Sequence, residues 1–148
     1  AIQPAVVRRD NGELVAYMRD NGIENRIQSA VSKDDGLTWG PVTAMEFANP
    51  GSGLDAVRLA NGHWALIYND EREGRNRLAV SISDDEGKTW KWKRMLEDKP
   101  EGSFDYPAII QGKDDTIHAV YSYDGDVGES MKHAAFNEAW VMEPGEKK

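Results

Sequence analysis

The chain of 148 residues contains no cysteine, and this absence removes several kinds of chemistry from consideration. Disulfide bonds, thiol catalysis and thiolate metal sites all need cysteine, so the sequence excludes them and leaves the redox compartment open. Basic residues are also in the minority: 18 Lys and Arg against 26 Asp and Glu give a formal net charge of −8. Nucleic acids and anionic membranes bind clustered Lys and Arg, so we expect neither partner.

Long hydrophobic runs are absent as well. No stretch approaches the roughly 18 apolar residues of a membrane span, and none reads as a signal peptide. A strand-like run begins as early as Ile2, which predicts that a further segment precedes this chain. Hydrophobic residues nevertheless make up 39% of the sequence, so there is enough apolar material to offset the entropy lost on folding.

What the sequence does contain is a repeat of about 51 residues. Ser32 and Ser83 are 51 residues apart, and so are Trp39 and Trp90. Each unit alternates short β-rich runs with tight turns, and no window has the apolar i, i+3, i+4, i+7 spacing of a helix. The expected strands are 4–8, 13–18, 26–32 and 42–45 in the first unit, 55–59, 63–69, 77–83 and 92–95 in the second, and 107–111, 116–123 and 131–136 in the third.

Units of four short strands joined by hairpins are typical of a β-propeller blade. We therefore predict an all-β chain, one partial propeller over residues 1–148 with three four-stranded blades at approximately 3–45, 53–96 and 104–141. Propellers close with roughly four to eight blades, and closure protects the sheet edges. Three blades do not close, so we expect half of a six-bladed ring, completed by a second copy of the chain or by a missing N-terminal half.

Two loops share the pattern S-x-D-x-G-x-T-W in phase with the repeat. In such a loop the Asp accepts backbone N–H groups, the Gly takes a left-handed conformation and the Trp packs into the sheet. Hairpin geometry puts these loops on the face opposite any site built from the loops between second and third strands, so we expect a structural role. Their residues are Ser32, Asp34, Gly36, Thr38 and Trp39, and Ser83, Asp85, Gly87, Thr89 and Trp90.

These loops resemble the Asp box of sialidases, and nearly the whole chain is similar to the sialidase-like branch of the neuraminidase-repeat proteins. The similarity also covers the stretches 3–19, 75–80 and 105–121. It implies a secreted or periplasmic glycoside hydrolase that binds carbohydrate and uses neither a metal nor another cofactor.

The resemblance also implies roles for individual residues. Tyr106 corresponds to the nucleophilic tyrosine of sialidases, and Arg19 and Arg75 correspond to arginines that clamp a sugar carboxylate, a task that suits planar guanidinium groups. Gln3 stands where sialidases have the glutamate that activates the tyrosine. A neutral amide can orient a phenol but cannot take its proton.

Three further polar residues belong to the same predicted face. Asp55 is a candidate acid/base group, and Asp105 and Asn69 are candidate substrate-binding residues. An Asp at the start of a strand also caps turns, which is the alternative for Asp55 and Asp105. Three functions therefore stay open: an exo-glycosidase or half of one acting on a terminal acidic or related sugar, a non-catalytic carbohydrate-binding propeller, and an interaction module.

Overall fold

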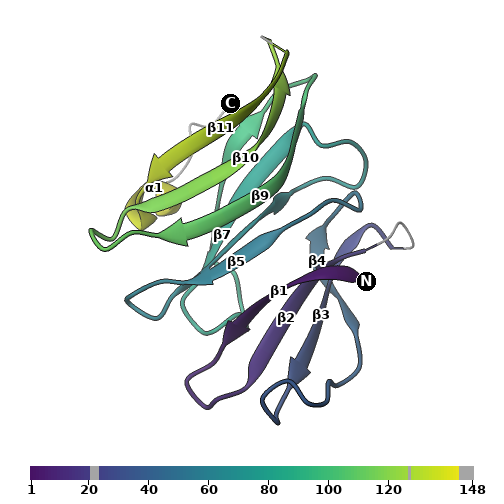
Figure 1. Ribbon diagram of the computed structural model, residues 1–148, viewed down its shortest axis with the longest axis vertical. Helices are drawn as coiled ribbons and strands as arrows, with labels where there is room; N and C mark the ends of the chain where they lie inside the picture. Colours follow the sequence, from purple (N-terminus) through teal and green to yellow (C-terminus); the bar gives the residue numbers. More distant parts are fainter. Residues whose placement is uncertain (21–23, 127, 144–148) are drawn as a thin grey trace.

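The computed structural model describes residues 1–20, 24–126 and 128–143, and it confirms an all-β fold with one short helix. Three antiparallel sheets follow one another along the chain (Figure 1). The elements are β1 (Ile2–Arg8), β2 (Leu14–Arg19), β3 (Arg26–Ser32), β4 (Thr43–Ala48), β5 (Asp55–Arg58), β6 (Trp64–Asn69), β7 (Arg77–Ser83), β8 (Trp92–Asp98), β9 (Ser103–Gln111), β10 (Ile117–Gly125), β11 (Gly128–Phe136) and α1 (Glu138–Met142).

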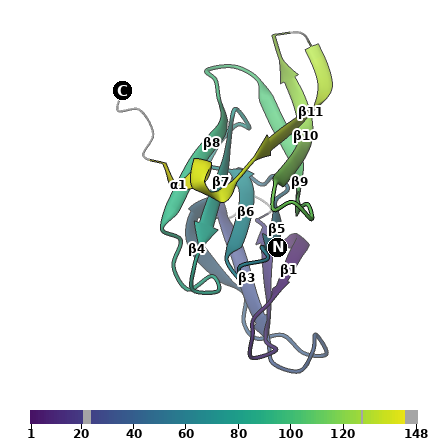
Figure 2. The same cartoon turned by 90° about the vertical axis from the view of Figure 1, so that its left-hand side faces the viewer.

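The first two sheets have four strands each, in the orders β1-β2-β3-β4 and β5-β6-β7-β8, whereas within the described residues the third consists of β9, β10 and β11. The expectation of three four-stranded blades is therefore wrong for the third sheet. After β11 the side chain of Asn137 accepts the N–H of Trp140 and caps α1. This helix contacts β7 and β8 of the second sheet instead of adding a strand to the third (Figure 2). No helix within the described ranges is both long and apolar enough to cross a membrane.

The ladders align the three sheets residue by residue. In each sheet the last residue of the first strand pairs with the first residue of the second, namely Arg8 with Leu14, Arg58 with Trp64, and Gln111 with Ile117. We use these pairs to define equivalent positions. Counting five residues back along the chain from Arg8, Arg58 and Gln111 makes Gln3, Gly53 and Tyr106 equivalent.

The sheets pack on one another through two hydrophobic cores. Tyr17 and Ile27 of the first sheet meet Trp64 and Leu66 of the second, and all four are buried. A second core joins the other face of the second sheet to the third. We call the face of a sheet that is turned toward the next sheet its forward face, and the opposite one its backward face. Because the packing is face to face, the first strands β1, β5 and β9 lie side by side (Figure 1).

Candidate functional site

Three equivalent residues meet where the first strands begin. A Cβ atom built on Gly53 would lie 3.5 Å from Cδ1 of Tyr106 and 4.0 Å from Oε1 of Gln3. Gly53 therefore sits between the other two, and the lack of a side chain there leaves a gap between an amide and a phenol. Sequence reasoning missed Gly53.

Gln3 and Tyr106 both have left-handed backbones, with φ of 53° and 49°. Such values are uncommon for residues other than glycine and cost roughly 1–3 kcal/mol, so they persist where the surrounding structure enforces them. The pairing of β1 with β2 and of β9 with β10 shifts register at these points. Bulges of this kind re-aim side chains. The Tyr106 side chain is presented to solvent, and the residue is 54% exposed.

Arg19 lies beside Gln3 because the end of β2 pairs with the start of β1, Ile2 with Arg19. Its Nη1 donates a hydrogen bond of 2.9 Å to Oε1 of Gln3. Its Nε is buried and has no hydrogen-bond partner among the described residues. A guanidinium carries five N–H donors in all, so the hydrogen bond to Gln3 uses only part of the donor capacity of Arg19.

Arg75 is held on the other side of Tyr106. Its Nη1 donates to Oδ2 of Asp105 at 2.9 Å, and its guanidinium carbon lies 5.7 Å from the centre of the Tyr106 ring. The hydrogen bond to Asp105, assisted by the Tyr106 hydroxyl, raises the pKa of Arg75. Ser103 also donates to Asp105, at 3.1 Å. Asp105 is therefore placed to position the arginine.

A cavity of about 460 Å³ opens beside the Tyr106 ring, between the starts of β9 and β11. Its walls carry carboxylates and hydroxyl groups, which suit a ligand rich in hydroxyl groups. The lining residues are Ser103, Asp105, Tyr106, Ser122, Tyr123, Asp124, Glu129, Ser130 and Met131.

Two expected site residues are used inside the protein. Asn69 is fully buried, and its side chain bonds to Ser52 and to two backbone carbonyls, so it does not reach a ligand. Asp55 accepts the N–H of Ile109 at 2.9 Å and so ties β5 to β9. From the sequence alone, a polar residue at the end of a strand looks alike whether its side chain faces solvent or the interface between two sheets. The structure brings together Gln3, Arg19, Arg75, Asp105 and Tyr106.

The two Asp boxes fold alike. The Oγ atoms of Ser32 and Ser83 each accept the N–H of the box glycine at 2.9 Å, and Asp34 and Asp85 each accept a threonine N–H at 2.8 Å. Asp35 of the first box pairs with Arg8 at the end of β1, and Glu86 of the second box accepts the N–H of Asp10 in the β1–β2 turn, so both boxes lie at the end of the sheets away from Gln3. Within the described ranges, no cluster of three or more His, Cys, Asp or Glu side chains is arranged to hold a metal ion.

Residues 1–119 match the model of the BNR repeat-like domain. The chain belongs to this family. A sialidase of Micromonospora viridifaciens is 25% identical over 91% of this chain and 21% of that protein, so the chain spans about a fifth of the length of this curated relative. The resemblance to sialidases and neuraminidase-repeat proteins is thereby confirmed.

Solved structures agree in fold. A leech intramolecular trans-sialidase bound to 2,7-anhydro-Neu5Ac superposes with a TM-score of 0.81, at 16% identity, over 94% of this chain and 24% of that one. An intramolecular trans-sialidase of Ruminococcus gnavus gives 0.81 at 18% identity over 96% and 34%. An α-L-arabinanase of Penicillium chrysogenum gives 0.67 at 19% identity over 92% and 46%. At these identities the likeness shows the fold of the BNR repeat-like domain alone.

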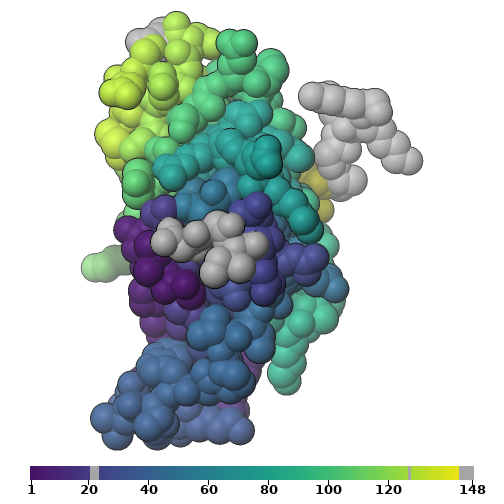
Figure 3. Space-filling view, turned by 90° about the vertical axis from the view of Figure 1, so that its right-hand side faces the viewer, coloured from purple at the N-terminus to yellow at the C-terminus, as the bar shows by residue number. Residues whose placement is uncertain are grey.

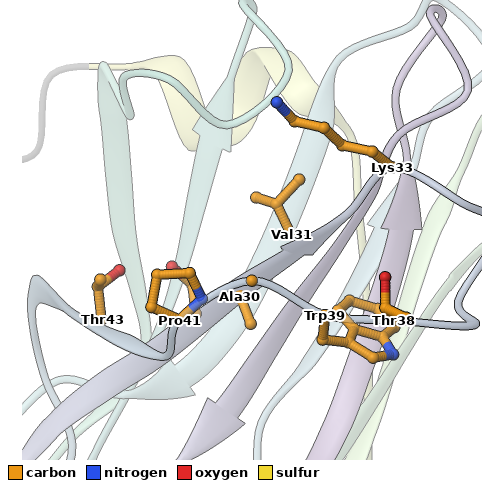
Figure 4. A pocket seen from close by; sticks show the side chains of 9 residues that line it. Ala30, Val31, Lys33, Thr38, Trp39, Pro41 and Thr43 are labelled. Carbon is orange, nitrogen blue, oxygen red and sulfur yellow. The ribbon is translucent and has the colours of Figure 1, made fainter.

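The two box tryptophans of this BNR repeat-like domain differ. Trp90 packs edge-on against Tyr17 and against Phe47, both in the preceding sheet. Trp39 is 41% exposed and borders an open cavity of about 520 Å³ with Ala30 and Pro41 (Figure 4). Among the described residues, the expectation that the box tryptophan packs into the sheets is therefore confirmed for Trp90 and not for Trp39.

The pKa of a box carboxylate determines how the stability of the domain changes at low pH. Burial alone raises the pKa of Asp85, but hydrogen bonds from Thr89 and Ser83 outweigh burial, and the pKa falls from 3.8 to about 2. A lowered carboxyl pKa stabilises the fold above the unfolded value, and this contribution is lost as pH falls from 3.8 toward 2. Because the loop is exposed to solvent, the contribution is at most about 1 kcal/mol.

We expect Asp85→Asn to lower the free energy of unfolding at neutral pH and to flatten its decline below pH 4. Urea titrations at about pH 7, 4 and 2.5 measure both effects. Asp84→Asn makes the same charge change in the same loop, where Asp84 pairs with Lys91, and serves as the control. Equal pH profiles for the two variants would contradict the prediction.

Proposed function

We propose that this chain is part of a sialidase-like exo-glycoside hydrolase that acts on a terminal acidic or related sugar. The observation that carries the proposal is the meeting of Gln3, Gly53 and Tyr106 at equivalent strand starts, with Arg19 and Arg75 on either side. The sialidase relative and the trans-sialidase folds support a carbohydrate-active protein of this class.

Tyr106 is the nucleophile in this proposal. Its oxygen attacks the anomeric carbon as the bond from that carbon to the leaving oxygen breaks, and a carboxyl group outside the five residues of this site protonates the leaving group. Water then hydrolyses the tyrosyl-sugar bond, so the configuration is retained, as in other glycosidases with a tyrosine nucleophile. Arg19 and Arg75 hold the carboxylate of the sugar through charge-assisted hydrogen bonds.

Binding of carbohydrate without catalysis is the second candidate function. Gln3 favours it, because its amide oxygen already accepts a hydrogen bond from Arg19 at 2.9 Å and has no basic site for the phenol proton. In the catalytic alternative, Gln3 orients the arginine, and the proton leaves Tyr106 toward water or toward a carboxylate from another part of the ring.

A complete site needs more sheets than this chain supplies. We propose that the three sheets are half of a six-bladed propeller, completed by a second copy or by a further half of the same protein. Each chain brings Arg19 and Arg75 to the channel, so a pair of chains brings four arginines.

Arg19→Ala tests the carboxylate clamp. We expect the variant to raise KM for aryl sialosides and aryl uronides by roughly 10- to 100-fold, since a hydrogen bond to a charged group contributes about 1.5–3 kcal/mol. Neutral aryl glycosides should be unaffected. Arg72→Ala, which removes an exposed arginine from the β6–β7 loop, is the matched control.

The outcomes of this panel separate the two functions. An equal rise in KM for acidic and neutral glycosides would show that Arg19 does not recognise the carboxylate. Measurable binding of an acidic sugar by the wild type, with no release of the aryl group, would favour the binding function over hydrolysis.

A further inference from the structure

The start of β9 contains a bulge at Tyr106 and Pro107. These two residues lie opposite a single residue of β10, Tyr121, because the register of the ladder shifts between Val120 and Ser122. Tyr106 has a left-handed backbone, with φ of 49°, although a residue that precedes proline favours the extended region. The conformation that presents the Tyr106 side chain therefore has to be held by its surroundings.

Asn69 fastens β9 on the N-terminal side of the bulge. Its Nδ2 donates to the carbonyl of Phe104 at 2.8 Å and to the carbonyl of Arg77 at 3.1 Å. Its Oδ1 accepts the hydroxyl of Ser52 at 2.6 Å. Asn69, Ser52 and Phe104 are all fully buried. The amide thus uses both of its N–H donors in the interior, and one of them fixes Phe104, two residues before Tyr106.

Asp55 fastens β9 on the C-terminal side of the bulge. Its Oδ2 accepts the N–H of Ile109 at 2.9 Å, and its Oδ1 accepts the N–H of Ala56, also at 2.9 Å. Ile109 is buried and follows Tyr106 by three residues. Because the second hydrogen bond orients the carboxylate, the first one holds Ile109 in a defined place.

Both anchors lie on the forward face of the second sheet. Side chains two residues apart in a strand share a face, so Asp55 lies on the side of Val57, and Asn69 on the side of Ile67. Val57 and Ile67 pack in the core that joins the second sheet to the third. The space-filling view of the side on which β1 begins shows the first sheet in purple and blue, the second in teal and the third in green, one above another (Figure 3). The anchors therefore act across an interface whose two sides both belong to this chain.

The same network fixes the segment that carries Gly53. Oδ1 of the fully buried Asn49 accepts the N–H of Ser52 at 3.0 Å, and its Nδ2 donates to the Ser52 carbonyl at 3.1 Å. Ser52 precedes Gly53, where a Cβ atom would lie 3.7 Å from Cα of Tyr106. Through Ser52, the amide of Asn69 joins the segment of Gly53 to the strand of Tyr106.

We propose that Asn69 and Asp55 are positioning residues that hold Tyr106 for its reaction with the sugar. Phe104 pairs with Tyr123 and Ile109 with Ala119, so four residues of β9 lie between the anchored positions, opposite three residues of β10. The extra residue goes into the bulge and turns the Tyr106 side chain to solvent. This inference rests on the proposed function, in which Tyr106 is the nucleophile, and it gives Asp55 a role other than acid/base catalysis.

Backbone NMR of Tyr106 tests the positioning without a sugar. The chemical shifts of Cα and Cβ distinguish a left-handed backbone from an extended one. We expect Asn69→Asp and Asp55→Ala to move the Tyr106 shifts toward extended values, because each variant removes one anchor and the residue precedes proline. Ser81→Ala is the matched control, since it removes a buried hydrogen bond to Tyr68 in the same sheet, and it should leave the Tyr106 shifts unchanged.

Kinetics on aryl glycosides separate positioning by Asp55 from catalysis by its carboxylate. Asp55→Ala should lower kcat roughly 10- to 100-fold, since a displacement of about 1 Å at the reacting group costs that much. KM should stay within about twofold, because the hydrogen bonds of Asp55 go to Ala56 and Ile109 and not to an arginine. Asp55→Asn keeps an acceptor oxygen for the N–H of Ile109, so its kcat should stay within about threefold of the wild type. A loss of kcat in Asp55→Asn as large as that in Asp55→Ala would overturn the positioning role.

Circular dichroism and thermal melting show whether each variant folds, and Asp55→Ala keeps the test available if Asn69→Asp does not fold. Left-handed shifts for Tyr106 in the folded variants would overturn the proposal. A wild type that releases no aryl group would instead contradict the proposed hydrolysis. The NMR result would then still decide whether the two anchors hold Tyr106, so the two failures are distinguishable.

Discussion

Replacing Tyr106 by phenylalanine is expected to abolish release from any aryl glycoside that the wild type hydrolyses, with a loss of roughly a thousandfold or more in kcat. The variant lacks only the nucleophilic oxygen. Because the side chain is half exposed and its hydroxyl is not part of a core, the fold should be unchanged. Substrate affinity should change little, since Arg19 and Arg75 remain.

The measurement is initial-rate kinetics on aryl glycosides, combined with intact-mass analysis of the wild type during turnover. A sugar adduct on the wild type that Tyr106→Phe does not form would identify the acceptor oxygen. Tyr68→Phe is the control, because it deletes a hydroxyl that bonds to Ser81 inside the core and leaves the site untouched. Release that survives Tyr106→Phe would remove this residue as the nucleophile.

Of the glycine-to-alanine substitutions in the two Asp boxes, Gly87→Ala should cause the larger loss of stability. A Cβ at Gly87 would overlap the hydroxyl of Tyr17 and would lie 2.8 Å from Cζ3 of Trp64. The backbone φ of 82° adds a further cost for any side chain. Overpacking costs about 1–3 kcal/mol and the left-handed backbone about 1–2 kcal/mol, so we expect about 3 kcal/mol in total.

The variant Gly36→Ala separates the cost of overpacking from the cost of the left-handed backbone. Gly36 has a φ of 89°, but a Cβ there would meet only Leu14 Cδ1, at 3.6 Å, and the edge of Trp39. We therefore expect about 1 kcal/mol, from the backbone alone. Urea unfolding measures both variants, and the difference of about 2 kcal/mol should lower the melting temperature of Gly87→Ala by roughly 4–8 °C relative to Gly36→Ala. Equal losses would show that the core around Tyr17 relaxes.

Much of the fold could be predicted because the signals that produce it are local. The sequence places β3 at 26–32 and β7 at 77–83, and the structure confirms both. Each of these strands ends in the serine that opens an Asp box, so the boundary is marked by the chemistry of the loop. The start of β9 is less accurate: the sequence predicts 107, but the strand begins at Ser103. Pro107 cannot donate to a ladder, yet an edge strand accommodates it at a bulge.

The site was harder to predict because it depends on register across sheets. The repeat of 51 residues aligns Ala5 with Ala56, but the ladders make Asp55 the equivalent of Ala5, and this shift of one residue conceals Gly53. The short helix α1 was also not predicted, since five residues are too few to display a helical period. The capping residue Asn137 was the one local signal for it.

The attachment of α1 determines where a pulling force on the end of the chain would go. Glu138 bonds to Asn61 at 2.7 Å and to His63, and Arg94 lies 4.0 Å over the Trp140 ring while donating to the Trp140 carbonyl at 2.8 Å. All three partners belong to the second sheet or its turn, although α1 follows directly on the third. Tension applied from the C-terminal side therefore reaches the second sheet before it reaches β11, and the third sheet is shielded from being unzipped strand by strand.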